Sequence, residues 1–164
     1  MLIDQFANKT QEQKERAYAY AVYLLSLKLR TEGEIKAKLK IKYQNEKIIE
    51  EVIEELKGLK YLDDERYAQV FLENLKKYKN FGYFGIKKKF IEKRLPSQLI
   101  EKTLSEGLSE EEELVIAKRL VKKYVVKPHN EITASSDLYG ARQKLAKKLA
   151  SKGFRTGVIS KVVF

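Results

Sequence analysis

The chain has 164 residues, no cysteine, and 34 lysine and arginine residues against 23 aspartate and glutamate residues, which gives a net charge of +11. This composition excludes disulfides and cysteine metal sites, and the sequence has neither the ~20-residue apolar run of a membrane helix nor a signal-peptide pattern in residues 1–16. The length predicts one domain or several small repeats, and a sequence pI near 9.6 is typical of proteins that bind polyanions, although a solvated helix surface rich in lysine and glutamate would give a similar value.

Apolar residues recur at helical spacing almost throughout, and glycine and proline are sparse, so the sequence predicts an all-α fold. The first helix is expected over about residues 11–29. Thr31 and Glu34 can form a capping box that begins a short second helix. Asn45 can cap a third helix, which we expect to end near Gly58 with a left-handed residue.

Residues 61–68, with the sequence YLDDERYA, form the expected junction between two similar helical blocks. Asp63 can cap the following helix, and Asp64 and Glu65 place negative charge in its first turn, where the helix dipole favours it. The two apolar residues before the cap can pack back on the new helix. A metal site built on the three acids is the alternative, and the capping role accounts for them without a metal.

The second block is expected to begin with a helix over about residues 63–78. A turn at Gly82–Gly85 follows, and a further helix reaches about Arg94. Pro96 suits the first turn of a helix, so the third helix of this block is expected from there to Gly107.

The third block opens with a second capping box at residues 109–112. Residues 127–135 are expected to form a loop that contains the only histidine, His129, and we expect this side chain to be solvated rather than bound to a metal. The last two helices are predicted over about residues 136–152 and from Thr156 to the C-terminus.

One pattern of apolar residues occurs three times, with intervals of four, nine, one and four residues, and its copies are separated by 51 and then 59 residues. The positions are Ile35, Leu39, Ile48, Ile49 and Ile53; Ile86, Phe90, Leu99, Ile100 and Leu104; and Leu145, Leu149, Val158, Ile159 and Val163. The pattern predicts three tandem three-helix repeats, over residues 1–60, 61–108 and 109–164, that stack into an elongated or curved rod. Chance matching in a helical sequence rich in leucine and isoleucine is the alternative.

The positive charge lies mainly in the last two repeats, because residues 1–62 carry 12 cations and 10 acids, a net charge of only +2. We call the following cations the basic ridge and predict that they contact a filament or DNA: Lys76, Lys77, Lys79, Lys87, Lys88, Lys89, Lys93, Arg94, Lys118, Arg119, Lys122, Lys123, Arg142, Lys144, Lys147, Lys148, Lys152 and Arg155. Ordinary solvated lysine is the alternative. Tyr78, Phe81, Tyr83 and Phe84 lie among these cations and can stack with bases, or fill the joint between helices, as we expect for Phe81 and Phe84.

Several of these segments resemble the RecX family, the regulatory proteins of the RecA recombinase. The strongest match is residues 61–68, which are similar to the Asp-Asp-x-Arg-aromatic-Ala signature of the family. The other matching segments are residues 21–25, 30–35, the pair Gly82 and Ile86, and residues 143–154, so the resemblance covers most of the chain. Two residues depart from the family pattern: Arg94, where glycine is usual, and Lys152, where arginine is usual.

The resemblance implies three tandem three-helix units and a cytoplasmic bacterial protein that functions in DNA recombination, DNA repair and the SOS response. Family members lie in the helical groove of the RecA nucleoprotein filament and generally inhibit its recombinase and ATPase activity. We therefore expect the RecA filament and single-stranded DNA as partners, with double-stranded DNA left open, no membrane partner, and a monomeric chain.

The sequence contains no nucleotide-binding fingerprint, zinc-ligand pair or nucleophile with a histidine base, so we expect no enzyme, no catalytic residue, no cofactor and no metal. Two other functions stay open: a stand-alone basic helical DNA-binding module or transcription regulator, and a purely structural adaptor. Gly82 and Gly85, followed by three lysines, also fit a backbone-clamping loop like that of KH domains, although a plain helix start explains them as well.

Overall fold

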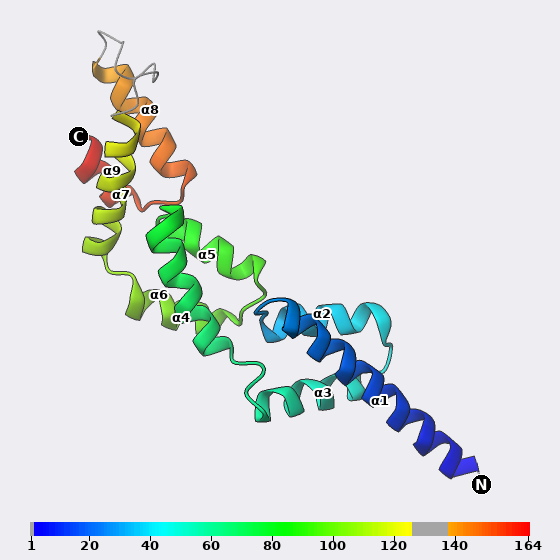
Figure 1. The fold of residues 1–164 in the computed structure, drawn as a ribbon. Coiled ribbons are helices and arrows are strands. Elements are labelled where there is room, and N and C mark those ends of the chain that lie inside the picture. Colours follow the sequence, from blue (N-terminus) through cyan, green and yellow to red (C-terminus); the bar gives the residue numbers. More distant parts are fainter. Residues whose placement is uncertain (1, 126–137) are drawn as a thin grey trace. The chain divides into compact units, whose positions relative to one another are not determined.

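The computed structural model describes residues 2–125 and 138–164, and every regular element in these residues is helical, which confirms the all-α fold (Figure 1). The elements are α1 (Leu2–Leu27), α2 (Glu32–Lys42), α3 (Glu46–Gly58), α4 (Asp64–Asn74), the π-helical turn η1 (Leu75–Lys79), α5 (Tyr83–Glu92), α6 (Ser97–Gly107), α7 (Glu110–Val125), α8 (Leu138–Ser151) and α9 (Thr156–Val163). The predictions for His129, its loop and the start of the helix at residue 136 lie outside the described residues.

The contacts divide the chain into two compact units. The first contains the residues up to Tyr67 together with Lys93–Leu95, and the second contains Ala68–Glu92 and Pro96–Phe164. In the first unit, α1 and α2 both pack on α3. Its buried apolar residues are Ala17, Ala21, Leu24, Ile35, Leu39, Ile48, Ile49, Val52, Ile53, Leu56 and Leu62.

In the second unit, α5 packs on α6, and α7 and α8 both pack on α9. The repeated apolar positions are buried in both units, except Leu99 and Leu145, which are half-buried. These positions therefore face the cores because a helix brings residues three and four apart onto one side.

The predicted helix starts are confirmed by their hydrogen bonds. The Glu34 N–H donates to Thr31 Oγ1 at 3.1 Å and the Thr31 N–H donates to the Glu34 carboxylate at 3.3 Å, which completes the capping box. The second box is complete between Ser109 and Glu112, with distances of 3.1 and 3.0 Å. Asp63 Oδ1 accepts the N–H of the residue three positions later at 2.9 Å and so caps α4.

The third helix ends at Gly58 as predicted, and the left-handed residue that follows is Lys60, with φ of 58°. Two other local predictions are wrong. The helix predicted to run from Asp63 to residue 78 changes at Leu75 into a π-helical turn. Finally, α5 already begins at Tyr83, so the turn predicted at Gly82–Gly85 is largely helix.

Both glycines of that segment have a packing role instead. A Cβ atom placed on Gly85 would overlap the carbonyl of Lys152, and one placed on Gly82 would overlap the backbone of Phe154. Glycine is thus required at both positions for the close approach of two backbones rather than for a turn.

A joint inside the first unit links the start of α2 to later residues. The Thr31 hydroxyl donates to the Lys93 carbonyl at 2.5 Å, and the Glu32 N–H donates to Asp64 Oδ1 at 2.8 Å. Arg94 has a left-handed backbone with φ of 57°, and a Cβ atom placed on Gly33 would overlap it. An acid from α4 therefore satisfies one of the orphan N–H groups at the start of α2.

The second unit contains an equivalent joint at the start of α5. Gly82 lies 51 residues after Thr31 and Lys152 lies 59 residues after Lys93, the same offsets as in the core, and the Gly82 N–H donates to the Lys152 carbonyl at 3.1 Å. Gly153, with φ of 77°, occupies the left-handed position of Arg94. Glu113 of α7 replaces Asp64 as the acid, because its Oε1 accepts the Tyr83 N–H at 3.0 Å.

Glu113 is fully buried, and its carboxylate accepts from two further groups. The same Oε1 accepts the N–H of Arg155 at 2.9 Å, just before α9, and Oε2 accepts from the Arg155 guanidinium. One carboxylate of α7 thus fixes the starts of both α5 and α9.

Candidate nucleic-acid interface

Helical periodicity separates cations from the core on α7, one of the helices of the basic ridge. Ile116, Ala117 and Leu120 are buried, whereas Lys118 and Lys122 are exposed. The same division holds on α8, where Leu149 is buried. An apolar stripe on one side of each helix therefore leaves the charged side for solvent or a partner.

Several ridge lysines are held by acids of the same unit. Lys76 Nζ lies 3.0 Å from Glu73 and 2.8 Å from Glu112, and it also donates to the Gly107 carbonyl at 2.9 Å. Partial burial opposes the charged form, but the hydrogen bonds to Glu112 and Glu73 outweigh it and raise the pKa of Lys76. The main role of Lys76 is therefore to hold η1 against α7.

The next paired lysines lie on α5. Lys87 Nζ lies 2.5 Å from the Glu101 carboxylate, and this hydrogen bond raises the pKa of Lys87 and lowers that of Glu101. Lys89 Nζ lies 2.7 Å from Glu92. These pairs are exposed to solvent, so each stabilises the fold only weakly and an incoming phosphate can compete for the lysine.

Three further ridge residues have partners. Lys93, in the first unit, lies 3.2 Å from Glu34, and Arg155 pairs with the buried Glu113. The Arg119 guanidinium donates to the carbonyls of residues 76 and 77 at 3.1 and 3.4 Å. Arg119 thereby satisfies carbonyl groups of the π-helical turn.

Ten ridge cations of the second unit have no carboxylate partner among residues 2–125 and 138–164. They are Lys77, Lys79, Lys88, Lys118, Lys122, Lys123, Arg142, Lys147, Lys148 and Lys152. We call them the unpaired cations. Arg94 of the first unit also has no carboxylate partner among the described residues. Lys144 is not counted among the unpaired cations, because it takes part in another interaction. Because no acid of the described chain neutralises the unpaired cations, they can offer their charge to an external anion.

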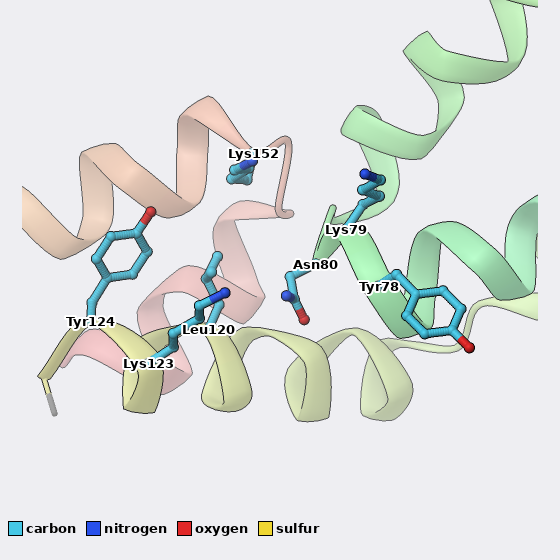
Figure 2. A pocket seen from close by; sticks show the side chains of 7 residues that line it. All are labelled: Tyr78, Lys79, Asn80, Leu120, Lys123, Tyr124 and Lys152. Carbon is cyan, nitrogen blue, oxygen red and sulfur yellow. The ribbon is translucent and has the colours of Figure 1, made fainter. Parts of the chain in front are cut away.

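A hollow of about 230 Å³ lies among the unpaired cations of the second unit. Figure 2 shows its seven lining side chains, which come from η1 and the residue after it, from α7 and from the residue that follows α8. The lining residues are Tyr78, Lys79, Asn80, Leu120, Lys123, Tyr124 and Lys152. The lining thus contains three ammonium groups and no carboxylate.

The aromatic residues are divided between the surface and the packing. Phe81 is half-buried beneath Lys152, whose Nζ lies 4.7 Å from the ring centroid, as expected for a ring at a joint. Phe84 is 56% exposed, so the prediction that it fills the joint is wrong; Gly85 and Gly153 meet there backbone to backbone instead. Tyr78 is 63% exposed.

Sequence reasoning missed the residues that shape this region. The sequence analysis assigns no role to Glu113, because its partners lie 30 and 42 positions away. The π-helical turn has no clear signal in the sequence. For the left-handed Asn80, with φ of 50°, the only local signal is that asparagine tolerates this conformation. In the described part of the chain, no helix combines the length and apolar character needed to cross a membrane.

Taken together, the described residues define a basic, all-α protein with two compact units. A family model described as the first three-helix domain of RecX matches residues 17–56. The chain belongs to the RecX family of regulatory proteins.

Two curated relatives illustrate the similarity. The regulatory protein RecX of Clostridium botulinum (strain Alaska E43 / Type E3) is 34% identical over 122 residues, which cover 74% of this chain and 55% of that protein. That of Clostridium acetobutylicum is 31% identical over 120 residues, with 73% and 54% covered. The chain spans about half the length of the curated relatives it matches.

Two solved structures share the fold. The crystal structure of RecX from Lactobacillus salivarius matches with a TM-score of 0.81 and 23% identity over 93% of this chain and 96% of that one. A second crystal structure of a regulatory protein RecX matches with a TM-score of 0.83 and 24% identity, over 99% of this chain and 77% of that one. The fold of the second unit, which carries the unpaired cations, is therefore part of the shared architecture.

Proposed function

We propose that this protein regulates the RecA recombinase by binding the RecA–DNA filament in its helical groove, and that it lowers recombinase and ATPase activity. The observation that carries the proposal is the set of ten unpaired cations in the second unit of a RecX-family fold. Binding would take place in the cytoplasm, with a monomer of three stacked repeats bridging neighbouring recombinase subunits.

The charge supports a partner that contains nucleic acid. Each phosphate that a lysine or arginine engages releases condensed counterions, so the affinity should fall steeply as salt increases. A ligand shifts a filament between states only by its differential affinity for them, so inhibition requires tighter binding to the state that turns over more slowly.

The ATPase activity of a preformed RecA filament on single-stranded DNA tests the proposal. The rate is expected to fall as this protein is added at about 50 mM salt and to recover at about 200 mM salt. An unchanged rate at saturating protein and low salt would contradict the proposal.

Two variants with equal charge loss locate the surface. The ridge variant replaces Lys118, Arg142 and Lys147 by glutamine, and all three residues are exposed unpaired cations. The control variant replaces the exposed residues Lys9, Lys28 and Lys47 of the first unit in the same way. The ridge variant should bind the filament more weakly than the control; equal affinities would mean that net charge alone determines binding.

A further inference from the structure

The hollow lined by η1, α7 and the residue that follows α8 has the chemistry of a site for a phosphate ester. Lys79, Lys123 and Lys152 line it, and none of them has a carboxylate partner in the part of the chain that the structure describes. Like charges gathered around one hollow repel one another, and an anion bound between them removes that repulsion. A phosphate group also offers several oxygen acceptors to ammonium donors.

The surroundings hold two of these lysines, Lys152 and Lys79, in position. Lys152 Nζ lies over the ring of Phe81 at 4.7 Å, and the Lys152 carbonyl accepts the Gly82 N–H at 3.1 Å. The Arg119 guanidinium holds the π-helical turn that carries Lys79, because it donates hydrogen bonds to two carbonyls of that turn. π-Helical turns occur frequently at functional sites, since they change the direction of the side chains that follow.

The hollow also has features suited to a base or sugar beside the phosphate. Tyr124 and Leu120 line it with an aromatic ring and an apolar side chain, and Lys148 Nζ lies 5.3 Å from the centroid of the Tyr124 ring. Asn80 Oδ1 is buried without a hydrogen-bond partner among the described residues. Rotation about the last side-chain torsion would turn this acceptor toward a ligand, where a base or sugar donor can satisfy it.

We propose that this hollow seats one nucleotide of a nucleic-acid strand, with the phosphate held by Lys79, Lys123 and Lys152 and the base beside Tyr124. This inference rests on the proposed function. A strand is favoured over a free nucleotide because further unpaired cations, among them Lys77 and Lys122, occur on the same elements and can hold the adjoining phosphates.

The test compares two variants with the same loss of charge in the same unit. The hollow variant replaces Lys79, Lys123 and Lys152 by glutamine, and the ridge variant defined above serves as the reference. Fluorescence anisotropy with a labelled oligothymidylate at about 50 mM salt should give a dissociation constant for the hollow variant on the order of tenfold weaker than that of the ridge variant. Equal losses would overturn the nucleotide seat while leaving the ridge as the binding surface; if neither variant loses affinity for oligonucleotide or filament, the proposed interface fails as well.

Two further measurements identify the ligand. Asn80→Gly keeps the left-handed backbone available and removes the amide, so it should weaken oligothymidylate binding several-fold without lowering the melting temperature. Wild-type affinity in this variant would exclude the role of the amide. Unlabelled thymidine triphosphate should displace the oligonucleotide only at millimolar concentration; displacement at micromolar concentration would overturn the strand as the ligand and assign the seat to a free nucleotide.

Discussion

Removal of the Glu113 carboxylate should destabilise the second unit more than any single change at its surface. In Glu113→Ala, the N–H groups of Tyr83 and Arg155 and the Arg155 guanidinium all lose their acceptor. Truncating one partner of a buried ion pair costs about 3–5 kcal/mol, because the remaining charge is left uncompensated. Since the Arg155 side chain is 32% exposed and can reach water, we expect the lower half of that range.

The assay is urea unfolding followed by circular dichroism, together with amide hydrogen exchange resolved by residue. Exchange is needed because a chain with two compact units need not unfold in one step. The amides of Tyr83 and Arg155 should exchange much faster in the variant. Glu111→Ala is the matched control, since Glu111 is an exposed acid on the same helix and its loss should change stability by no more than about 0.5 kcal/mol. A loss below about 1 kcal/mol for Glu113→Ala would refute the role assigned to this carboxylate.

Two further predictions concern the joints. Gly153→Ala should lower the melting temperature of the second unit, at a cost of about 2–4 kcal/mol, because φ is 77° and the new Cβ would overlap Gly85. Arg94→Gly, at the equivalent position of the first unit, should change stability by less than about 1 kcal/mol. Equal effects of the two substitutions would contradict the close backbone approach at Gly153. Burial raises the pKa of Asp64 above its ordinary value of 3.8, so its contribution to folding is full below that pH and is lost as pH rises through the folded pKa. Asp64→Asn keeps an acceptor for the Glu32 N–H but does not ionise, so it does not lose stability as the pH rises. Urea titrations at acidic and neutral pH should therefore show the stability of the variant, relative to the wild type, increasing with pH. A stability difference that does not change with pH would count against the burial of Asp64.

The features that the sequence predicted correctly depend on neighbours close in the chain. The capping boxes at Thr31 and Ser109 join residues three apart, and the apolar spacing of the core follows from helix geometry. The missed features depend on distant partners. Glu113 looks like one of four consecutive acids, and only the fold brings it against Tyr83 and Arg155.

The candidate interface shows the same limit. Counting charges predicted where cations gather, but it could not separate Lys87, which is paired with Glu101, from the neighbouring Lys88, which has no such partner in the described residues. That distinction depends on how α5 packs against α6, and therefore on the tertiary structure.

The measurement that tests the central claim most directly is a pair of binding titrations, one with bare single-stranded DNA and one with the same DNA coated by RecA and nucleotide. A regulator that recognises the filament should bind the coated DNA more tightly at equal salt. Equal or tighter binding to the bare strand would instead identify a general DNA-binding protein.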